Sequence, residues 1–184
     1  MKEKEIFEHL ARFQAEGKSL FVTSSFQTHS IPLLHLLSRF DKQIPIYCIQ
    51  TGYLFPETLT FRDEVAEMLN MQVIDIRSAV AKIHQRDTEG NLLFTSDPDR
   101  CCYLNKVQPM ESILSQHDIW INGVRASQNT NRAQMRLMQD AGFGCERFHP
   151  LLYWTDKDIY QYRMAHDLPE HPLEQKGYFS IGCE

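Results

Sequence analysis

The fold is decided by the stretch Ser19-Leu20-Phe21-Val22-Thr23-Ser24-Ser25-Phe26-Gln27-Thr28-His29-Ser30, which the apolar residues 31–40 follow. Its first five residues are apolar and partly β-branched, which predicts a short strand. The next seven are polar and predict a loop. Residues 31–40 predict a helix with Pro32 in its first turn, where proline is tolerated. A strand, a polar loop and a helix in this order are typical of an α/β protein.

The same alternation continues on both sides of this stretch. Residues 2–16 have apolar positions at helical spacing, and Gly17 ends that helix. Residues 44–49 and 71–76 predict two more strands, with a helix ending near Asn70 between them. Strands that alternate with helices form a parallel sheet with right-handed crossovers. Ligands bind such sheets outside the carboxyl ends of the strands, so we expect the loops after Thr23, Ile49 and Ile76 to form one rim.

The second half of the chain is less regular. Residues 77–100 are polar and rich in turn formers, and we expect an irregular excursion there. We expect a helix over 101–116, a strand over 118–123 and a helix over 159–166, followed by an extended tail. Trp120 and Trp154 are expected in the core, Cys48 in packing and Cys145 at the surface.

Composition narrows the class of protein. The 184 residues predict one domain, 1–184. The formal charge of −5 argues against general nucleic-acid binding, which leaves a basic footprint. No apolar run is long enough to cross a membrane, and the N-terminus lacks the apolar core of a signal peptide, so we expect a cytoplasmic protein. Five cysteines at irregular spacing do not form a disulfide framework and favour metal or redox chemistry.

Cys101 and Cys102 are adjacent, and Cys183 follows near the end of the chain. Neighbouring Cα atoms are about 3.8 Å apart, whereas disulfides need roughly 4.4–6.8 Å. A disulfide between the pair would be strained, but two thiolates can bind one metal centre. We therefore predict a cluster held by Cys101, Cys102 and Cys183. A zinc site and two merely buried neighbours are the alternatives.

Three groups could bind an anion. The loop 24–30 precedes a helix, whose N-terminal amides favour negative charge, although such a loop is also an ordinary helix cap. Lys106 follows Cys102 by four residues, a spacing that places both side chains on one face of a helix. The alternative is that Lys106 is an ordinary exposed lysine. Arg125 and Arg132 flank a polar segment, and their guanidinium groups are suited to bind phosphate or sulfate. The alternative is that the segment is a solvated loop.

Together these motifs resemble the assimilatory sulfonucleotide reductases, the adenylyl-sulfate and phosphoadenylyl-sulfate reductases, from Ser19 to the last residue. The resemblance is carried by Ser24-Ser25-Phe26, by residues 51–58 (TGYLFPET), by residues 101–109 (CCYLNKVQP), by residues 123–132 and by residues 177–183 (GYFSIGC). Gln50 stands where the family has Asp, and Asn129 where it has Ser.

The resemblance implies the parallel-sheet, three-layer fold of the adenine-nucleotide alpha-hydrolase-like proteins. It implies reduction of adenosine 5′-phosphosulfate to sulfite and AMP in sulfate assimilation, with thioredoxin or glutaredoxin as the reductant. It also implies a [4Fe–4S] cluster on Cys101, Cys102 and Cys183, and leaves self-association into a homo-oligomer open. The residues implied to bind the substrate are Ser24, Ser25, Phe26, Thr51, Gly52, Lys106, Arg125 and Arg132.

The resemblance also implies a nucleophilic cysteine on a C-terminal tail. Residues Cys183-Glu184 end the sequence before such a tail, so the catalytic residue stays unassigned, and we expect the sequence as it stands not to turn over. The alternatives are a phosphoadenylyl-sulfate reductase and a non-catalytic paralogue that binds a nucleotide or an iron–sulfur cluster. A related ATP-using pyrophosphatase would need a Ser-Gly-Gly-x-Asp-Ser loop, which residues 24–30 do not provide.

Overall fold

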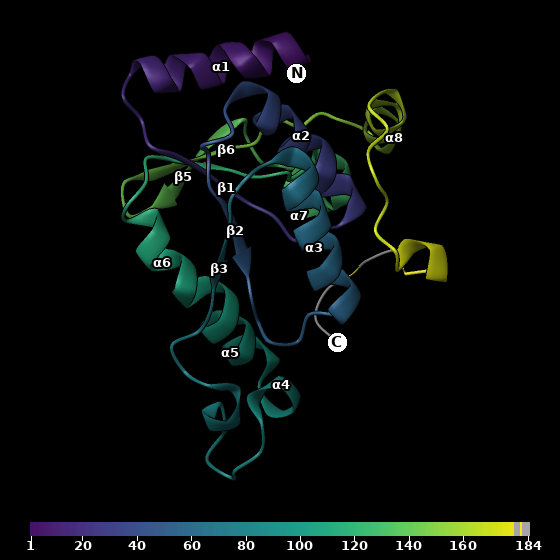
Figure 1. Ribbon diagram of the computed structural model, residues 1–184. Helices are drawn as coiled ribbons and strands as arrows, with labels where there is room; N and C mark the ends of the chain where they lie inside the picture. Colours follow the sequence, from purple (N-terminus) through teal and green to yellow (C-terminus); the bar gives the residue numbers. More distant parts are fainter. Residues whose placement is uncertain (179–180, 182–184) are drawn as a thin grey trace.

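The computed structural model describes residues 1–178 and Ile181, and a six-stranded sheet forms its centre (Figure 1). The strand order is β3-β2-β1-β4-β6-β5, and every neighbouring pair is parallel except β5 and β6. The strands are β1 (Leu20–Thr23), β2 (Ile46–Ile49), β3 (Val73–Ile76), β4 (Ile119–Ile121), β5 (Met138–Gly142) and β6 (Cys145–Phe148).

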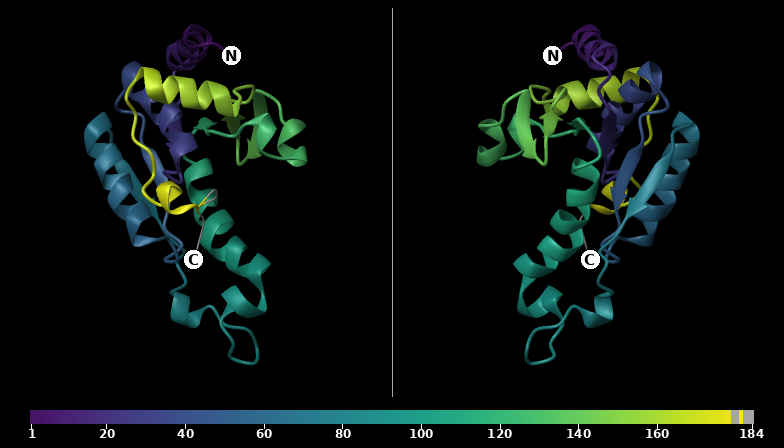
Figure 2. Two further views of the ribbon diagram at one scale, coloured as in Figure 1. Left: turned by 90° about the vertical axis from the view of Figure 1, so that its right-hand side faces the viewer. Right: turned by 90° about the vertical axis from the view of Figure 1, so that its left-hand side faces the viewer.

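Helices cover both faces of the sheet (Figure 2). The larger core lies on one face, beneath α1 (Glu3–Ala15), α2 (Ile31–Phe40), α3 (Pro56–Leu69) and α8 (Asp156–Ala165). The smaller core lies on the opposite face, beneath α6 (Gln108–Leu114). This arrangement confirms the predicted α/β fold with a largely parallel sheet between helical layers.

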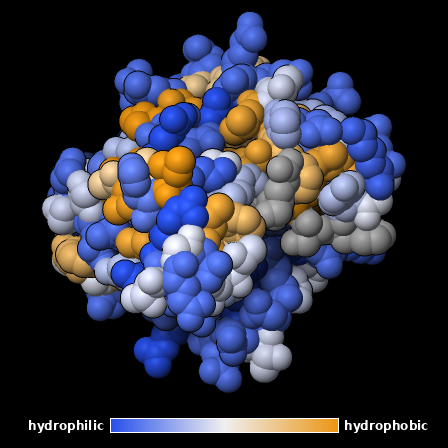
Figure 3. Space-filling model, turned by 90° about the horizontal axis from the view of Figure 1, so that it is seen from below, coloured by the Kyte–Doolittle hydropathy of each residue, from blue (hydrophilic) through white to orange (hydrophobic). Residues whose placement is uncertain are grey.

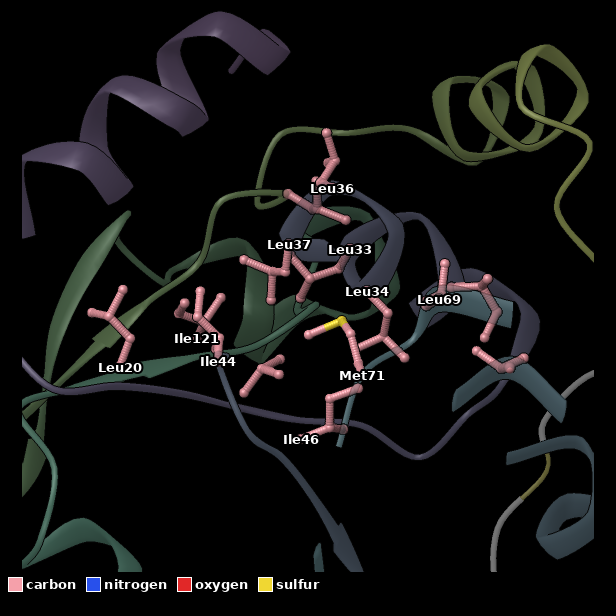
Figure 4. Packing of buried hydrophobic residues seen from close by; sticks show 14 of the residues in the cluster. Leu20, Leu33, Leu34, Leu36, Leu37, Ile44, Ile46, Leu69, Met71 and Ile121 are labelled. Atoms are coloured by element: carbon pink, nitrogen blue, oxygen red, sulfur yellow. The ribbon is translucent and has the colours of Figure 1, made fainter. Parts of the chain in front are cut away.

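Alternation along β1 shows how the sequence builds these layers. Leu20 and Val22 pack into the larger core, and Phe21 between them packs into the smaller one, as the period of two along a strand requires. The larger core continues into the apolar face of α2 and includes Leu33, Leu37 and their neighbours (Figure 4). The apolar segments therefore set which face each helix covers.

The remaining segments are short. They comprise η1 (Thr28–Ser30), η2 (Lys82–His84), α4 (Leu93–Ser96), α5 (Pro98–Cys102), η3 (Tyr103–Val107), η4 (Ala126–Gln128), α7 (Thr130–Ala133) and η5 (Glu174–Lys176). The excursion formed by residues 77–97 lies at the lower end of the molecule in Figure 1. Viewed from below, this end shows hydrophobic groups interspersed with hydrophilic ones (Figure 3). No helix of the described residues has the length and apolar character needed to span a bilayer.

The helix that follows the excursion contains a widened turn. The amide of Gln108 donates to the carbonyl of Tyr103, five residues earlier, so η3 is a π-helical turn between α5 and α6. Pro109 explains it: proline has no N–H, and its ring would collide in a regular helix with the carbonyl of Asn105. A π turn makes room for the ring, and such turns are frequent at functional sites.

The structure also corrects the sequence-based expectations. The hairpin β5–β6 was not predicted, and Cys145 in β6 is fully buried rather than at the surface. The residues of its turn, Gly142, Phe143 and Gly144, all have positive φ, which favours glycine at the outer two. Trp120 and Trp154 are only partly buried. The helix expected over 101–116 consists of α5, η3 and α6.

Candidate anion-binding cavity

A cavity of about 420 Å³ lies at the carboxyl ends of β1, β2 and β4. Its lining includes residues that directly follow these strands, such as Ser24, Thr51 and Asn122. Other parts of the wall come from η3, from the segment 123–135 and from the end of β6. The loops after Thr23 and Ile49 line the cavity as expected, whereas the loop after Ile76 does not, and the segment after β4 takes its place.

The loop after β1 is held by Phe26. Its ring is fully buried in the larger core and its φ is 54°, an unusual value for a residue with a side chain. The Phe26 amide donates to Ser24 Oγ at 3.0 Å, and Ser24 Oγ contacts Ser30 Oγ at 3.2 Å. Ser24 and the exposed Ser25 both line the cavity. Phe26 thus anchors the loop, and the serines face the space.

Three cationic side chains line the cavity: Lys106 from η3, Arg132 from α7 and Arg147 from β6. The described residues of the lining include no Asp or Glu. The Arg147 guanidinium lies 4.5 Å from the ring centroid of Trp120, which also lines the cavity, and no ion pair of Arg147 occurs among the described residues. Burial lowers the pKa of Arg147, yet a guanidinium stays charged in proteins. The cavity is therefore suited to an anion.

Two histidines of the lining carry no charge at neutral pH. Burial lowers the pKa of His29 to about 4, and the nearby charges of Arg125 and Arg132 act in the same direction. Burial also lowers the pKa of His149, whose Nδ1 donates to the carbonyl of Arg136 at 2.7 Å. The positive charge of the cavity thus comes from its lysine and arginine side chains and not from these histidines.

Arg125 lies elsewhere. Its side chain is 5% exposed, and its Nη1 donates to Asp156 at 2.6 Å. Its amide donates to Gln128 Oε1 at 3.0 Å, and Arg132 donates to the same oxygen. Arg125 does not line the cavity, although it lies close enough to His29 to affect its pKa. Arg125 thus braces the segment 125–128, which precedes the helix α7 that carries Arg132.

The loop after β2, residues 50–55, forms another side of the cavity. Thr51 lines the space, and its hydroxyl accepts the amide of Tyr53 at 3.1 Å. Gly52 has a φ of 75°, and a Cβ there would lie 2.8 Å from the side chain of Lys82. Lys82 donates to the Gly52 carbonyl, and its ammonium lies 3.5 Å from the Tyr53 ring centroid. The positive φ favours glycine at position 52, and a Cβ there would displace the flexible end of the Lys82 side chain.

The structure therefore brings together five of the predicted substrate-binding residues around the cavity. Gly52 adjoins the lining, Phe26 lies in the core, and Arg125 lies in the ion pair with Asp156. The five residues that line the cavity are Ser24, Ser25, Thr51, Lys106 and Arg132.

Cys101 is partly buried and Cys102 is exposed, both in α5. Asn105 Nδ2 lies 3.6 Å from Cys101 Sγ and can donate to it. Two adjacent, accessible thiols supply half of the Cys₄ set that holds a [4Fe–4S] cluster. The part of the chain that the structure describes contains no cluster of three or more metal-binding side chains, and Cys183 lies outside it. The pair thus fits a cluster that takes its remaining ligands from elsewhere.

The other two described cysteines differ in environment. Burial raises the pKa of Cys48 and of Cys145 to about 11, so both stay protonated at neutral pH. The thiolate is the reactive form of cysteine. Neither residue is therefore suited to be a nucleophile.

Sequence reasoning included His29 only as part of the loop 24–30, and it missed Trp120 and Arg147 as cavity residues. Arg147 was missed because β6 was not predicted. The signal that could have found it is the Gly142-Phe143-Gly144 turn, since a glycine-rich turn between two short segments is typical of a β-hairpin.

Comparison with known proteins agrees with this geometry. Residues 19–184 match the phosphoadenosine phosphosulfate reductase domain. The chain is 41% identical over 167 residues to a phosphoadenosine 5′-phosphosulfate reductase of Xanthomonas axonopodis pv. citri, covering 88% of this chain and 68% of the relative. It is 33% identical over 168 residues to an adenosine 5′-phosphosulfate reductase of Salinibacter ruber, covering 91% of this chain and 67% of the relative.

Solved structures show the same fold. The phosphoadenylyl-sulfate reductase of Candida auris in its phosphate complex is similar with a TM-score of 0.77 at 21% identity, covering 96% of this chain and 87% of that one. An FMN adenylyltransferase of Candida glabrata is similar with a TM-score of 0.65 at 15% identity, covering 90% and 53%. The fold is thus shared with other nucleotide enzymes, whereas the sequence matches are specific. The chain belongs to the phosphoadenosine phosphosulfate reductase family.

Proposed function

We propose that the chain reduces adenosine 5′-phosphosulfate to sulfite and AMP in sulfate assimilation, with thioredoxin or glutaredoxin as the electron donor. Relatives named for either sulfonucleotide support the class of substrate. The choice of adenosine 5′-phosphosulfate rests on the adjacent cysteines, which resemble the cluster-bearing branch. Phosphoadenosine 5′-phosphosulfate is the alternative substrate.

The observation that carries the proposal is the charge of the cavity. Lys106, Arg132 and Arg147 line it without any carboxylate among the described lining residues. A sulfonucleotide carries negative charge on its phosphate and on its sulfate, and both groups accept hydrogen bonds from such donors. The hydroxyls of Ser24 and Ser25 add donors at the end of β1. The 50–55 loop then borders the adenosine.

The chemistry would proceed by transfer of sulfur. A thiolate attacks the sulfur of the sulfonucleotide, a sulfur–sulfur bond forms, and the bond from sulfur to the phosphate oxygen breaks with release of AMP. A thiol of the electron donor then attacks the bound cysteine and releases sulfite, leaving a disulfide. The cations of the cavity would stabilise the charge that develops on the departing phosphate. No described cysteine is assigned as the nucleophile.

Cys101 and Cys102, with Cys183, would hold the [4Fe–4S] cluster. When bound, the cluster would supply an electrostatic influence on the site. The chain's own contribution is Lys106, which follows the thiol pair in η3 and lines the cavity. Lys106 would hold the substrate's anionic end beside the pair.

Calorimetry with adenosine 5′-phosphosulfate and with phosphoadenosine 5′-phosphosulfate tests the substrate. We expect tighter binding of the first, and a loss of about tenfold for Lys106→Ala, the lower end of the effect of a charge-assisted hydrogen bond because Lys106 is exposed. Lys42→Ala, at an exposed position outside the lining, is the matched control. Equal affinity of wild type and Lys106→Ala for both nucleotides would remove Lys106 from the site. Sulfite release with thioredoxin or with glutaredoxin would identify the electron donor, and it would overturn the expectation that the sequence as it stands does not turn over.

A further inference from the structure

Gln85 and Asn105 form a buried pair of amides, each 3% exposed. Gln85 Nε2 donates to Asn105 Oδ1 at 3.0 Å, and Asn105 Nδ2 donates to Gln85 Oε1 at 2.6 Å. Gln85 Nε2 also donates to the carbonyl of Val80 at 2.8 Å. Asn105 Nδ2 also donates to the carbonyl of Cys101 at 2.8 Å. Every amide hydrogen of the pair has an acceptor, so the pair is a fully satisfied polar contact, and removing one partner leaves the other unsatisfied.

The pair holds the excursion to the rest of the molecule. Within the excursion, residues 77–97, Gln85 and Leu93 are the buried residues, and Ile83 and Phe94 are exposed. The amide of Leu93 donates to the carbonyl of Gln85 at 2.9 Å, so the position of Leu93 depends on that of Gln85. The amide pair thus anchors this segment together with the buried Leu93 and the ring contact between Phe94 and Tyr53.

On its other side the pair contacts α5, the helix that carries Cys101 and Cys102. Asn105 Nδ2 lies 3.6 Å from Cys101 Sγ in addition to its bond with the Cys101 carbonyl. Asn105 belongs to the π turn η3, and the next residue, Lys106, lines the cavity. One side chain therefore holds the backbone of Cys101, lies 3.6 Å from its thiol and belongs to the turn that carries Lys106.

The excursion also contacts the 50–55 loop. Gln85 follows η2, and its amide donates to the carbonyl of Lys82 at 3.1 Å. Lys82 in turn donates to the Gly52 carbonyl and lies over the Tyr53 ring. The short turn η2 and the adjoining Gln85 thus contact both the loop that carries Thr51 and the π turn that carries Asn105.

We propose that Gln85 and Asn105 are positioning residues that hold Cys101 and Lys106 in place and couple the thiol pair to the 50–55 loop through η2. The second arm of the test below uses adenosine 5′-phosphosulfate as the ligand, and this choice rests on the proposed function. The first arm uses no nucleotide.

The first arm uses the full chain after a chelator has removed any bound cluster, because thiolates bound to a cluster resist alkylation. It measures alkylation of each cysteine by iodoacetamide, followed by peptide mass spectrometry. Asn105→Leu and Gln85→Met keep the side-chain volumes and remove the amide pair. We expect the ratio of Cys101 to Cys102 alkylation to change about tenfold in both variants, the size of effect that one or two net hydrogen bonds have on an equilibrium. Gln72→Met, at an exposed position, is the matched control and should leave the ratio unchanged.

Buried Cys48 and Cys145 report general unfolding in the same experiment. If they become alkylated along with Cys101, the variants have lost the fold, and the swapped pair Gln85→Asn with Asn105→Gln then decides. Restoration of the wild-type ratio by the swap supports the positioning role. An unchanged ratio in the two single variants, with Cys48 and Cys145 protected, would overturn it.

The second arm measures the affinity for adenosine 5′-phosphosulfate. We expect Asn105→Leu to weaken binding about tenfold, by displacing Lys106, and Gln85→Met to weaken it similarly. If wild type binds the nucleotide and both variants bind it equally well, the coupling is wrong. If wild type does not bind it, the proposed function fails, and the alkylation ratio alone decides the positioning role.

Discussion

Replacing Arg147 by methionine should weaken anion binding without weakening the fold. Methionine keeps an unbranched apolar stem against Trp120 and removes only the guanidinium, which lies 4.5 Å from the ring centroid. Arg147 lines the cavity, its Nε is buried without a hydrogen-bond partner among the described residues, and its pKa is lowered by burial. The guanidinium is therefore kept at a cost to the folded state, which a bound anion would offset.

The magnitudes follow from these interactions. A charge-assisted hydrogen bond contributes about 1.5–3 kcal/mol, which corresponds to a decrease of roughly 10- to 150-fold in affinity. The cation–π interaction with Trp120, which the substitution removes, is worth about 0.5–1 kcal/mol at a partly exposed site. Removal of a desolvated charge should offset that cost, because Arg147 has no described ion-pair partner that would be left buried and uncompensated. We expect the free energy of unfolding to change by less than about 1 kcal/mol.

Calorimetry with adenosine 5′-phosphosulfate and urea unfolding of the same preparations check both halves of this prediction. Arg12→Met is the matched control, because Arg12 lies on α1 with a side chain that is 56% exposed, outside the lining of the cavity. The reasoning is refuted if Arg147→Met binds as tightly as wild type. It is also refuted if the variant unfolds far more easily than wild type, since the guanidinium would then serve the fold.

Two further predictions concern the loop after β1. The pKa of His29 is lowered from 6.5 to about 4, so the folded state binds a proton more weakly than the unfolded state does. The free energy of unfolding therefore falls by about 3 kcal/mol as the pH drops from 6.5 toward 4, and the full stability is present above pH 6.5. Urea midpoints between pH 7 and pH 4.5 should show this slope, and His29→Gln should flatten it; an identical slope in the variant contradicts the assignment. Phe26→Ala should lower the free energy of unfolding by about 3–5 kcal/mol, because it empties a fully buried site. A decrease below about 1 kcal/mol in urea unfolding would show that Phe26 does not anchor the loop.

Much of the fold could be predicted because local pattern and tertiary structure agree in the first half of the chain. The apolar residues 31–40 form α2 with the predicted bounds, and β1 lies within the predicted strand. The hairpin β5–β6 could not be predicted in this way. Residues 138–142 (MQDAG) contain no β-branched residue, and their strand forms because β6 and the turn after Gly142 support it.

The candidate site was predictable where position along the sheet decides it. Ser24 and Thr51 follow strands and therefore reach the rim at the carboxyl ends of the sheet. Arg125 and Arg147 could not be told apart from the sequence, since only the tertiary structure brings Asp156 against the first and leaves the second at the cavity. The role of Asn105 depends on a π turn that arises from a proline four residues later.

A crystal structure of the full chain with adenosine 5′-phosphosulfate tests the central claim most directly. We predict that the phosphate and sulfate lie within hydrogen-bond distance of Lys106, Arg132 and Arg147, with the adenosine against the 50–55 loop. Nucleotide bound away from the carboxyl ends of β1, β2 and β4, or bound in this cavity with its anionic groups turned away from all three cations, would contradict the account.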